Sequence, residues 1–210
     1  MPNRFAAAMA RLPLVAILRG LKAAEAPAML EALLVHGFAL IEVPLNSPDP
    51  LASVAAMRKL APPEVLVGAG TVLGVADVEA VARAGGDLIV MPHADLAVIR
   101  AAKALGLVCL PGVATPTEAF AALAAGADGL KAFPAEMIAP TVLRAWRAVI
   151  AREVPILPVG GIAPDSMAAY VAAGASGFGL GSALYRPGDS PERVASQAAA
   201  FVAAWRALRR

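Results

Sequence analysis

The stretch VLVGAGTVLGVADVEAVARAGGDLIVM, residues 65–91, contains one complete structural unit of this chain. It begins with the aliphatic run 65–69, continues as the alanine-rich amphipathic segment 75–84, and ends with a second aliphatic run, 87–91. Gly85 follows the amphipathic segment directly, at the position where helices commonly end on a glycine. This order predicts two parallel strands that are joined by a helix.

The same unit recurs along the whole chain. Short aliphatic runs with few charges are separated by amphipathic segments of helical period. We predict eight strands, at residues 14–18, 39–43, 65–69, 87–91, 107–110, 129–133, 156–160 and 177–181. We also predict helices, which include residues 24–36, 75–84, 117–125, 164–173 and 191–208.

The number of these units predicts the fold class. Eight strand–helix pairs with almost continuously apolar strands indicate a parallel sheet that helices cover on its outer face. About 200 residues is at the small end for a closed (β/α)8 TIM barrel, but within its range. A doubly wound open sheet is the main alternative, and the eighth strand favours closure. We therefore predict an α/β protein in which residues 1–210 form a single (β/α)8 barrel domain, with a short N-terminal helix at residues 4–11.

The composition excludes several classes of protein. The chain has 210 residues, of which 59% are hydrophobic, and a formal net charge of +2. It is therefore neither a disordered chain nor a disulfide scaffold, and we expect no nucleic-acid partner. Its one cysteine, Cys109, fits a core thiol in a reducing compartment. No uncharged run is a credible membrane helix, so we expect a cytoplasmic protein without a membrane partner.

Two opposite charges fall within predicted strands, Glu42 in the second and Lys131 in the sixth. These strands have the same parity in a barrel, so inward side chains at matching heights can approach each other. Desolvation disfavours a buried ammonium group, and the free amine can attack a carbonyl to form a Schiff base. We predict Lys131 as this nucleophile and Glu42 as a general acid/base. The alternatives are a lysine that only reaches the rim and a glutamate that is only its counter-ion.

Further polar residues and glycines follow other strands at the same end of the barrel. Arg19 and Thr71 follow the first and third strands, and we predict that both bind substrate. Alternatively, Arg19 is ordinary surface charge and Thr71 caps the next helix. Gly160–Gly161 and Gly181–Ser182 follow the seventh and eighth strands, the usual phosphate site of such barrels. We therefore predict a small phosphorylated ligand.

No cluster of histidine, cysteine or carboxylate residues has the spacing of a metal site. We expect neither a metal ion nor a cofactor. His93 lies in a loop on the same face without a nucleophile or metal ligand to pair with, so the sequence assigns it no role.

Seven segments are distinctive enough to identify a family. They are LVAILRG (14–20), IEVPLNSPDP (41–50), VGAGTVL (67–73), LPGVATPTEA (110–119), LKAFPAE (130–136), PVGGI (158–162) and GFGLGSALYRPG (177–188). In this order and spacing they resemble the 2-keto-3-deoxy-6-phosphogluconate aldolase family, from about residue 12 to the C-terminus. The resemblance is greatest to its 2-dehydro-3-deoxy-6-phosphogalactonate aldolase branch.

The resemblance implies a class I aldolase on a (β/α)8 barrel, commonly a homotrimer. Such an enzyme releases pyruvate and glyceraldehyde 3-phosphate from a six-carbon 2-keto acid phosphate. The roles that it implies are Schiff-base lysine for Lys131, general acid/base for Glu42, substrate binding for Arg19 and Thr71, and ligand contacts for Gly161, Gly181 and Ser182. The gluconate branch typically has an arginine where this chain has Asn46, which suggests a larger share of anion binding for Arg19.

Three alternatives to galactonate-type cleavage stay open. The same chemistry could act on the gluconate epimer. Another phosphate-binding barrel, such as an epimerase or decarboxylase, could use Lys131 only as a charge partner. A non-catalytic barrel could hold a sugar phosphate as a sensor.

Overall fold

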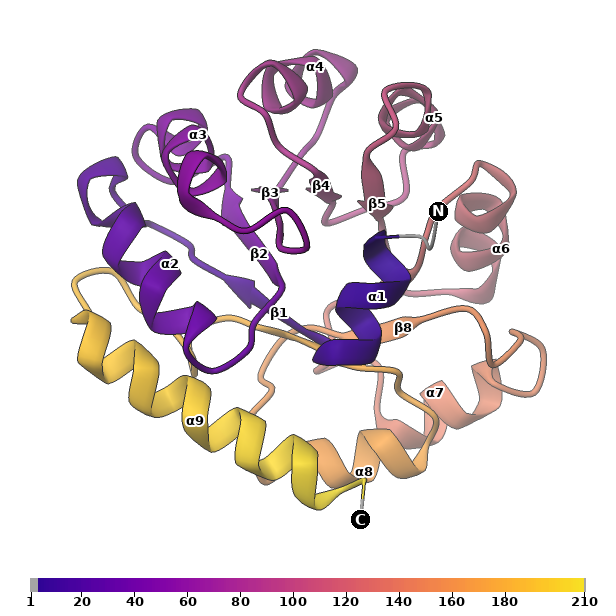
Figure 1. Cartoon of the computed structure of the whole chain (residues 1–210). Helices are drawn as coiled ribbons and strands as arrows, with labels where there is room; N and C mark the ends of the chain where they lie inside the picture. Colours follow the sequence, from indigo (N-terminus) through magenta and orange to yellow (C-terminus); the bar gives the residue numbers. More distant parts are fainter. Residues whose placement is uncertain (1–3, 210) are drawn as a thin grey trace.

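The computed structural model describes residues 4–209 and contains a parallel strand arrangement surrounded by helices (Figure 1). One sheet has the strand order β5-β4-β3-β2-β1-β9 and the other the order β6-β7-β8, and all of the pairs are parallel. The strands are β1 (Leu14–Ile17), β2 (Leu40–Pro44), β3 (Leu66–Gly70), β4 (Leu88–Val90), β5 (Val108–Leu110), β6 (Gly112–Val113), β7 (Leu130–Ala132), β8 (Ile156–Pro158) and β9 (Phe178–Leu180).

Two junctions join these sheets into a closed ring. β5 and β6 are consecutive and are separated only by Pro111, which has no N–H group for a strand ladder. The Pro111 carbonyl nevertheless accepts a hydrogen bond from the Lys131 N–H group at 2.9 Å, which continues the pairing to β7. At the other junction, a parallel bridge connects Val159, directly after β8, with Gly179 in the middle of β9. The predicted (β/α)8 barrel is confirmed, with its fifth strand divided by a proline.

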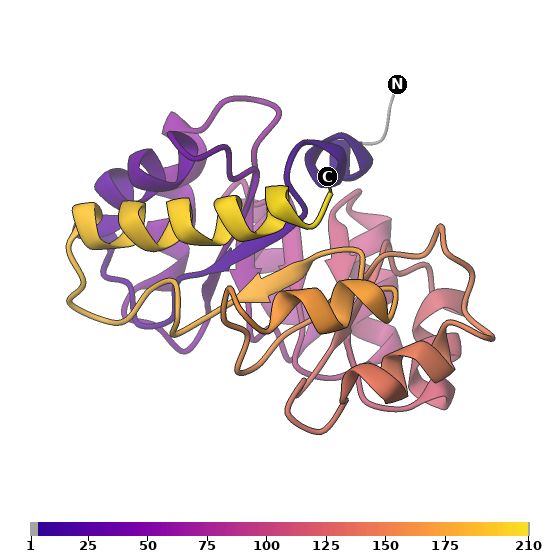
Figure 2. The same cartoon turned by 90° about the horizontal axis from the view of Figure 1, so that it is seen from below.

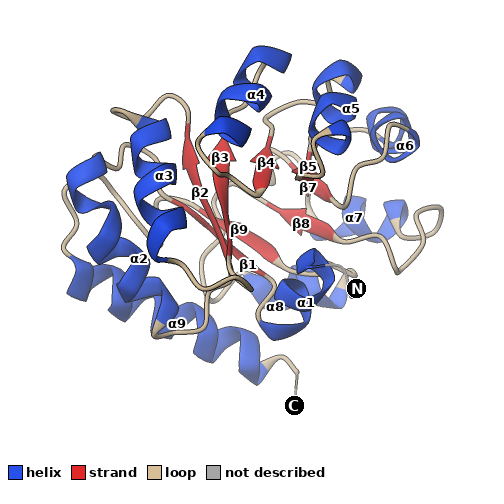
Figure 3. Ribbon diagram, turned by 45° about the horizontal axis from the view of Figure 1, so that its top comes forward, coloured by secondary structure: helices blue, strands red, loops and turns tan. Residues whose placement is uncertain are grey.

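The helices lie outside the ring of strands, as Figure 3 shows. They are α2 (Ala26–Leu34), α3 (Pro50–Leu60), α4 (Val75–Arg83), α5 (Leu96–Ala104), α6 (Pro116–Ala124), α7 (Pro140–Trp146), α8 (Met167–Ala172) and α9 (Pro191–Ala207). Thr115 shows how the sequence starts one of them: its hydroxyl accepts the Glu118 N–H, and the Glu118 carboxylate accepts the Thr115 N–H in return. The helix predicted from residue 164 begins only at Met167, because Ser166 bonds back to Ala163 in a tight turn.

The short helix α1 (Arg4–Arg11), which the sequence predicts, covers the amino end of the barrel and lies in front of the strands in Figure 1. Its apolar side buries Phe5 and Ala8. Arg4 donates to the Asp87 carboxylate and to the Pro63 carbonyl, each at 2.6 Å, and these acceptors precede β4 and β3. These bonds hold α1 against the loops that precede β3 and β4.

The long helix α9 packs against α2 and runs along one side of the barrel (Figure 2). The Phe178 ring of β9 makes edge-to-face contacts with Tyr170 and Trp205, with ring centroids 6.3 Å apart in both pairs.

Among the described residues, no helix is both long and apolar enough to cross a membrane.

Candidate active site

Aliphatic side chains dominate the interior, and the buried polar or charged side chains in the described part of the chain are Glu42, Ser47, Ser53 and Lys131. Lys131 lies on β7 and is 7% exposed, and Glu42 lies on β2 and is 1% exposed. The lysine ammonium nitrogen lies 4.5 Å from the centroid of the Phe133 ring. A buried lysine and a buried glutamate are costly to a fold, so their presence on two barrel strands calls for a chemical explanation.

Burial moves the pKa values of both groups towards their neutral forms. Desolvation lowers the pKa of Lys131, opposed by the Glu42 charge and aided by the charge of Arg19. Desolvation likewise raises the pKa of Glu42 to about 7, although Lys131, Arg19 and the Gly70 N–H group all act to lower it. Near neutral pH, Glu42 can therefore gain or release a proton, and Lys131 has a free amine more readily than a solvent-exposed lysine does.

Glu42 and Lys131 are neighbours that do not form a direct ion pair. No nitrogen–oxygen contact within 4.0 Å joins them among the ion pairs of the described residues. The Oε2 atom of Glu42 is buried without a hydrogen-bond partner. A methyl group at Gly70 would overlap the Glu42 carboxylate, so the glycine on β3 provides the space in which that carboxylate lies. Neither group is therefore held in a direct ion pair with the other.

Arg19 connects the loops that follow the first three strands. It donates to Asn46 Oδ1 at 2.6 Å and to Thr71 Oγ1 at 3.5 Å. Thr71 has a left-handed backbone with φ of 56°, and the residue that precedes α4 is Gly74, so Thr71 does not cap that helix. Asn46, to which the sequence assigned no definite role, thus orients the Arg19 guanidinium group.

The glycine turns lie at the carboxyl ends of β8 and β9. Gly160 and Gly161 have positive φ values of 118° and 60°, which a residue with a side chain rarely adopts. Together with Gly181 and Ser182 they line a cavity of about 510 Å³ that also reaches Lys131. The complete lining is Ile17, Arg19, Lys131, Phe133, Glu136, Val159, Gly160, Gly161, Ile162, Ala163, Gly181, Ser182, Ala183, Tyr185, Arg186 and Pro187.

The cavity brings together most of the residues that the sequence predicts for the site. Lys131, Arg19 and both glycine turns line it, whereas Glu42 and Thr71 are not part of its wall. Four charged or aromatic lining residues are missing from the sequence-based prediction: Phe133, Glu136, Tyr185 and Arg186. All four lie close in the sequence to predicted site residues: Phe133 and Glu136 share the segment of Lys131, and Tyr185 and Arg186 follow Ser182 by three and four residues.

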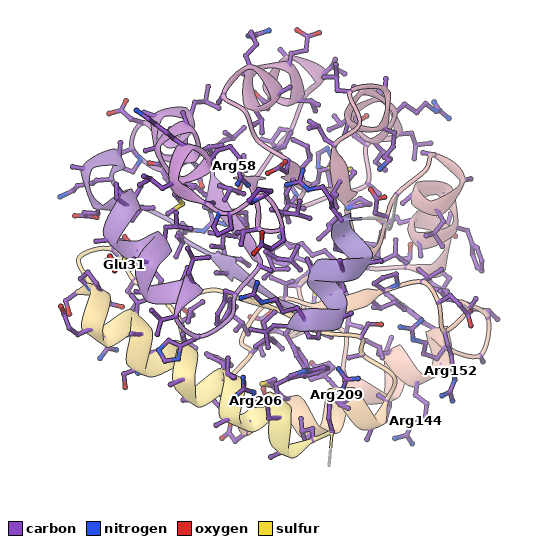
Figure 4. All side chains as sticks on the ribbon, viewed as in Figure 1. Glu31, Arg58, Arg144, Arg152, Arg206 and Arg209 are labelled. Carbon is purple, nitrogen blue, oxygen red and sulfur yellow. The ribbon has the colours of Figure 1, made fainter. Side chains whose placement is uncertain are left out.

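A larger cavity, of about 690 Å³, lies by the carboxyl-terminal ends of α7 and α8 and is lined by Arg144, Arg147 and Arg152. Arg147 donates to the carbonyls of Gly174, Ala151 and Val154, so its guanidinium group is used within the fold. Figure 4 shows Arg144 and Arg152 at the outer edge of the molecule. Helix carboxyl ends disfavour anions, and no buried group of altered pKa points to chemistry there apart from this structural arginine.

Within residues 4–209, no group of three histidine, cysteine, aspartate or glutamate residues could hold a metal ion.

Comparison with known proteins agrees with this geometry. Residues 5–192 match the model of the aldolase family described as "KDPG and KHG aldolase". The chain belongs to the KDPG and KHG aldolase family. This family consists of Schiff-base class I aldolases, which is the chemistry that a buried lysine with a lowered pKa supports.

Two relatives in the KDPG and KHG aldolase family carry the same name. A probable 2-dehydro-3-deoxy-6-phosphogalactonate aldolase of Rhizobium meliloti is 51% identical over 93% of this chain and 92% of its own. The 2-dehydro-3-deoxy-6-phosphogalactonate aldolase of Escherichia coli K12 is 47% identical over 93% of this chain and 96% of its own.

A solved structure described as native KDPGal is similar in fold over nearly its whole length. It superimposes with a TM-score of 0.93 at 46% identity, and the match covers 95% of this chain and 97% of that one. The resemblance found in the sequence is confirmed.

Proposed function

We propose that this protein is a class I aldolase that cleaves 2-dehydro-3-deoxy-6-phosphogalactonate to pyruvate and D-glyceraldehyde 3-phosphate. The reaction type is inferred from one observation: Lys131 is a buried lysine with a lowered pKa in the wall of the cavity. The relatives at 51% and 47% identity support the galactonate configuration of the substrate.

The reaction begins when the neutral amine of Lys131 adds to the C2 ketone of the substrate, and loss of water gives an iminium. Glu42 then removes the proton of the C4 hydroxyl, through a water molecule, because the carboxylate lies behind the cavity wall rather than in it. The C3–C4 bond breaks, its electrons pass to the iminium, and glyceraldehyde 3-phosphate leaves. The pyruvate enamine takes a proton at C3, and water hydrolyses the resulting iminium to release pyruvate and Lys131.

A pKa of about 7 suits Glu42 to both proton transfers of this reaction. As a carboxylate it accepts the hydroxyl proton, and as a carboxylic acid it returns a proton to the enamine. General acid/base groups act best when their pKa lies near the working pH.

The ends of the substrate have separate places in this proposal. Arg19, held by Asn46 and Thr71, binds the carboxylate end beside Lys131. The backbone N–H groups at Gly160–Gly161 and Gly181–Ser182 bind the phosphate end. His93 is not part of the cavity lining and has no role in the proposal.

Four further expectations remain part of the proposal. The chain acts as a single domain, assembles as a homotrimer as the resemblance implies, works in the cytoplasm, and uses no cofactor. Size-exclusion chromatography with light scattering measures the assembly, and a monomer would contradict that part.

The substrate is tested by comparing kcat/KM for the galactonate and gluconate epimers of the 2-keto-3-deoxy-6-phospho acid, with pyruvate release as the readout. We expect the galactonate epimer to be cleaved with the higher kcat/KM. A higher value for the gluconate epimer would reassign the substrate within the same chemistry. Cleavage of neither epimer, with sugar phosphates still bound, would favour an epimerase, a decarboxylase or a non-catalytic barrel.

A further inference from the structure

The loop that follows β9 holds an arginine at the phosphate end of the cavity. Arg186 Nε donates to the Ser182 carbonyl at 3.1 Å, which fixes the guanidinium group beside one of the two glycine turns. The backbone N–H of Arg186 donates to Asp189 Oδ2 at 2.9 Å, and Gly188, with φ of 87°, completes the turn. The loop thus has a defined shape that brings Arg186 into the cavity wall.

A second contact holds this loop against the barrel. Pro187 packs over Gly20, where an added methyl group would come within 2.6 Å of Pro187 Cγ. Gly20 has φ of 83° and follows Arg19, so the two loops that carry cavity arginines are in contact. The loop that carries Arg186 is therefore fixed against the barrel by the fold.

The guanidinium group of Arg186 has donors left for a ligand. Only its Nε atom takes part in a hydrogen bond among the described residues, and neither Nη atom is paired with a carboxylate there. The other cations of the cavity wall are Lys131 and Arg19, and Arg19 is directed to Asn46 and Thr71 on the loops after β2 and β3. The phosphate end of the cavity therefore has one full positive charge, that of Arg186.

An acidic neighbour makes this charge necessary. The Glu136 carboxylate lies against the Gly160–Gly161 turn so closely that a methyl group at Gly160 would overlap it. A phosphate ester carries a charge of about −1.5 to −2 near neutral pH, so a carboxylate beside the same turn repels it. Backbone N–H groups supply only partial charges, and a guanidinium group offsets the repulsion with two parallel donors.

We propose that Arg186 is the cationic ligand of the substrate phosphate and compensates for Glu136 at that end of the cavity. This inference rests on the proposed aldolase function and adds a binding residue to it. It predicts that Arg186 contributes to recognition of the phosphate and not to the chemistry at Lys131.

The test uses the condensation direction with two acceptors that differ only in the phosphate. Purified wild-type and variant proteins are assayed with pyruvate and either D-glyceraldehyde 3-phosphate or D-glyceraldehyde. For Arg186→Gln we expect kcat/KM to fall about 10- to 100-fold with the phosphorylated aldehyde, mainly through KM, and to stay within about twofold with D-glyceraldehyde. Arg186→Lys should show the same selectivity with a smaller loss, since it keeps the charge without the paired donors.

Two more variants sharpen the result. Arg100→Gln is the matched control, because Arg100 also carries a positive charge and is exposed, but it lies on α5 and outside the cavity wall. It should leave kcat/KM unchanged with both aldehydes. Glu136→Gln should act in the opposite direction to Arg186→Gln and increase kcat/KM for D-glyceraldehyde 3-phosphate about threefold to tenfold, because it removes the repelling charge.

Failure of this inference can be told apart from failure of the proposed function. If Arg186→Gln lowers kcat/KM equally for both aldehydes, or for neither, Arg186 is not a phosphate ligand. The aldolase proposal still stands in that case as long as wild-type protein condenses either aldehyde with pyruvate. If Arg186→Gln does not fold, Arg186→Lys decides the question, through the ratio of its kcat/KM with D-glyceraldehyde 3-phosphate to its kcat/KM with D-glyceraldehyde.

Discussion

At the amino end of the barrel, the Asp87 carboxylate lies between two arginines, whereas at the carboxyl end the Glu42 carboxylate has a buried oxygen without a partner. Arg4 and Arg58 approach Asp87 at 2.6 and 2.8 Å, and Arg58 also donates to the carbonyls of Ala61, Pro62 and Val65. These groups satisfy one another and join α1, α3 and the starts of β3 and β4. At the carboxyl end, the opposite charges of Glu42 and Lys131 do not form such an ion pair.

Two lysines show the difference most clearly. Lys103 on α5 donates to Asp128 at 2.5 Å and to the Leu107 carbonyl at 2.9 Å, so its charge is paired. Lys131 is more buried, contacts the Phe133 ring, and forms no ion pair with Glu42. Paired charges hold elements of the fold together. Buried charges without a direct partner lower the stability of the fold, but such groups can still change their protonation state. The first arrangement is structural, and the second is the one that the proposed mechanism requires.

The largest expected effect separates these two lysines. Lys131→Met removes the electron sink, so turnover should fall to the level of the uncatalysed reaction while the barrel stays folded. Lys103→Met should keep kcat within about twofold but lower the free energy of unfolding by about 1–3 kcal/mol, through loss of its bonds to Asp128 and Leu107. Pyruvate release and urea unfolding measure both variants. Measurable turnover in Lys131→Met would remove the basis of the comparison.

The next effect concerns proton transfer by Glu42. Glu42→Gln keeps the size of the side chain but cannot accept a proton, so kcat should fall about 10²–10⁴-fold. In wild-type protein, kcat/KM should rise as the pH increases through about 7, because the Glu42 carboxyl group then loses its proton. Steady-state assays between pH 5 and 9, run for both proteins, measure the slope. A wild-type profile without a rise in this range would count against Glu42 as the base.

Arg19 should matter for binding more than for chemistry. Arg19→Gln removes a charged donor from the cavity wall and should lower kcat/KM about 10- to 100-fold, mainly by raising KM. Asn46→Ala, which only frees the Arg19 guanidinium group, should cause a smaller loss in the same direction. The assay is pyruvate release at several substrate concentrations. An Arg19→Gln variant with wild-type KM would show that Arg19 is ordinary surface charge.

The smallest effect is on stability and depends on pH. The pKa of Glu42 is about 7 in the folded protein and near its ordinary value of 4.5 when unfolded, so the folded state binds more protons between these values. Stability from this group is therefore greatest below about pH 4.5 and is lost as the pH rises to about 7, by on the order of 1–3 kcal/mol. Urea unfolding of wild-type protein and Glu42→Gln at pH 5 and pH 8 isolates this contribution. Identical pH slopes in the two proteins would contradict the raised pKa.

The sequence predicted the barrel because each strand is a short aliphatic run between two helices with clear ends. Gly37, Gly85, Gly126 and Gly174 all have positive φ after helices, where the sequence placed helix ends. The eight predicted strands match the observed ones within two residues at either end. The pairing of β6 with β7, beyond Pro111, was not predicted. A proline usually marks the end of a strand, and the sequence alone does not show that a partner strand continues the pairing after it.

The site could be predicted where a residue lies in a strand or directly after one, because the strand then determines its position. Lys131 and Glu42 follow from strand parity, and the glycine turns from their place after the last strands. Phe133, Glu136 and Arg186 enter the cavity from loops, and the hydrogen bond from Arg186 to Ser182 depends on how the turn at Gly188 closes. Loop side chains are set by such contacts, which the sequence does not display.

The most direct test of the central claim is chemical trapping of the buried amine. Wild-type protein is incubated with pyruvate, reduced with sodium borohydride, digested, and analysed by mass spectrometry, with Lys131→Met and Lys103→Met treated in parallel. We predict a stable pyruvate-derived adduct on Lys131 in wild-type protein and in Lys103→Met, and none in Lys131→Met. Absence of an adduct on Lys131 in active wild-type protein, or an adduct on another lysine that accounts for turnover, would contradict the account.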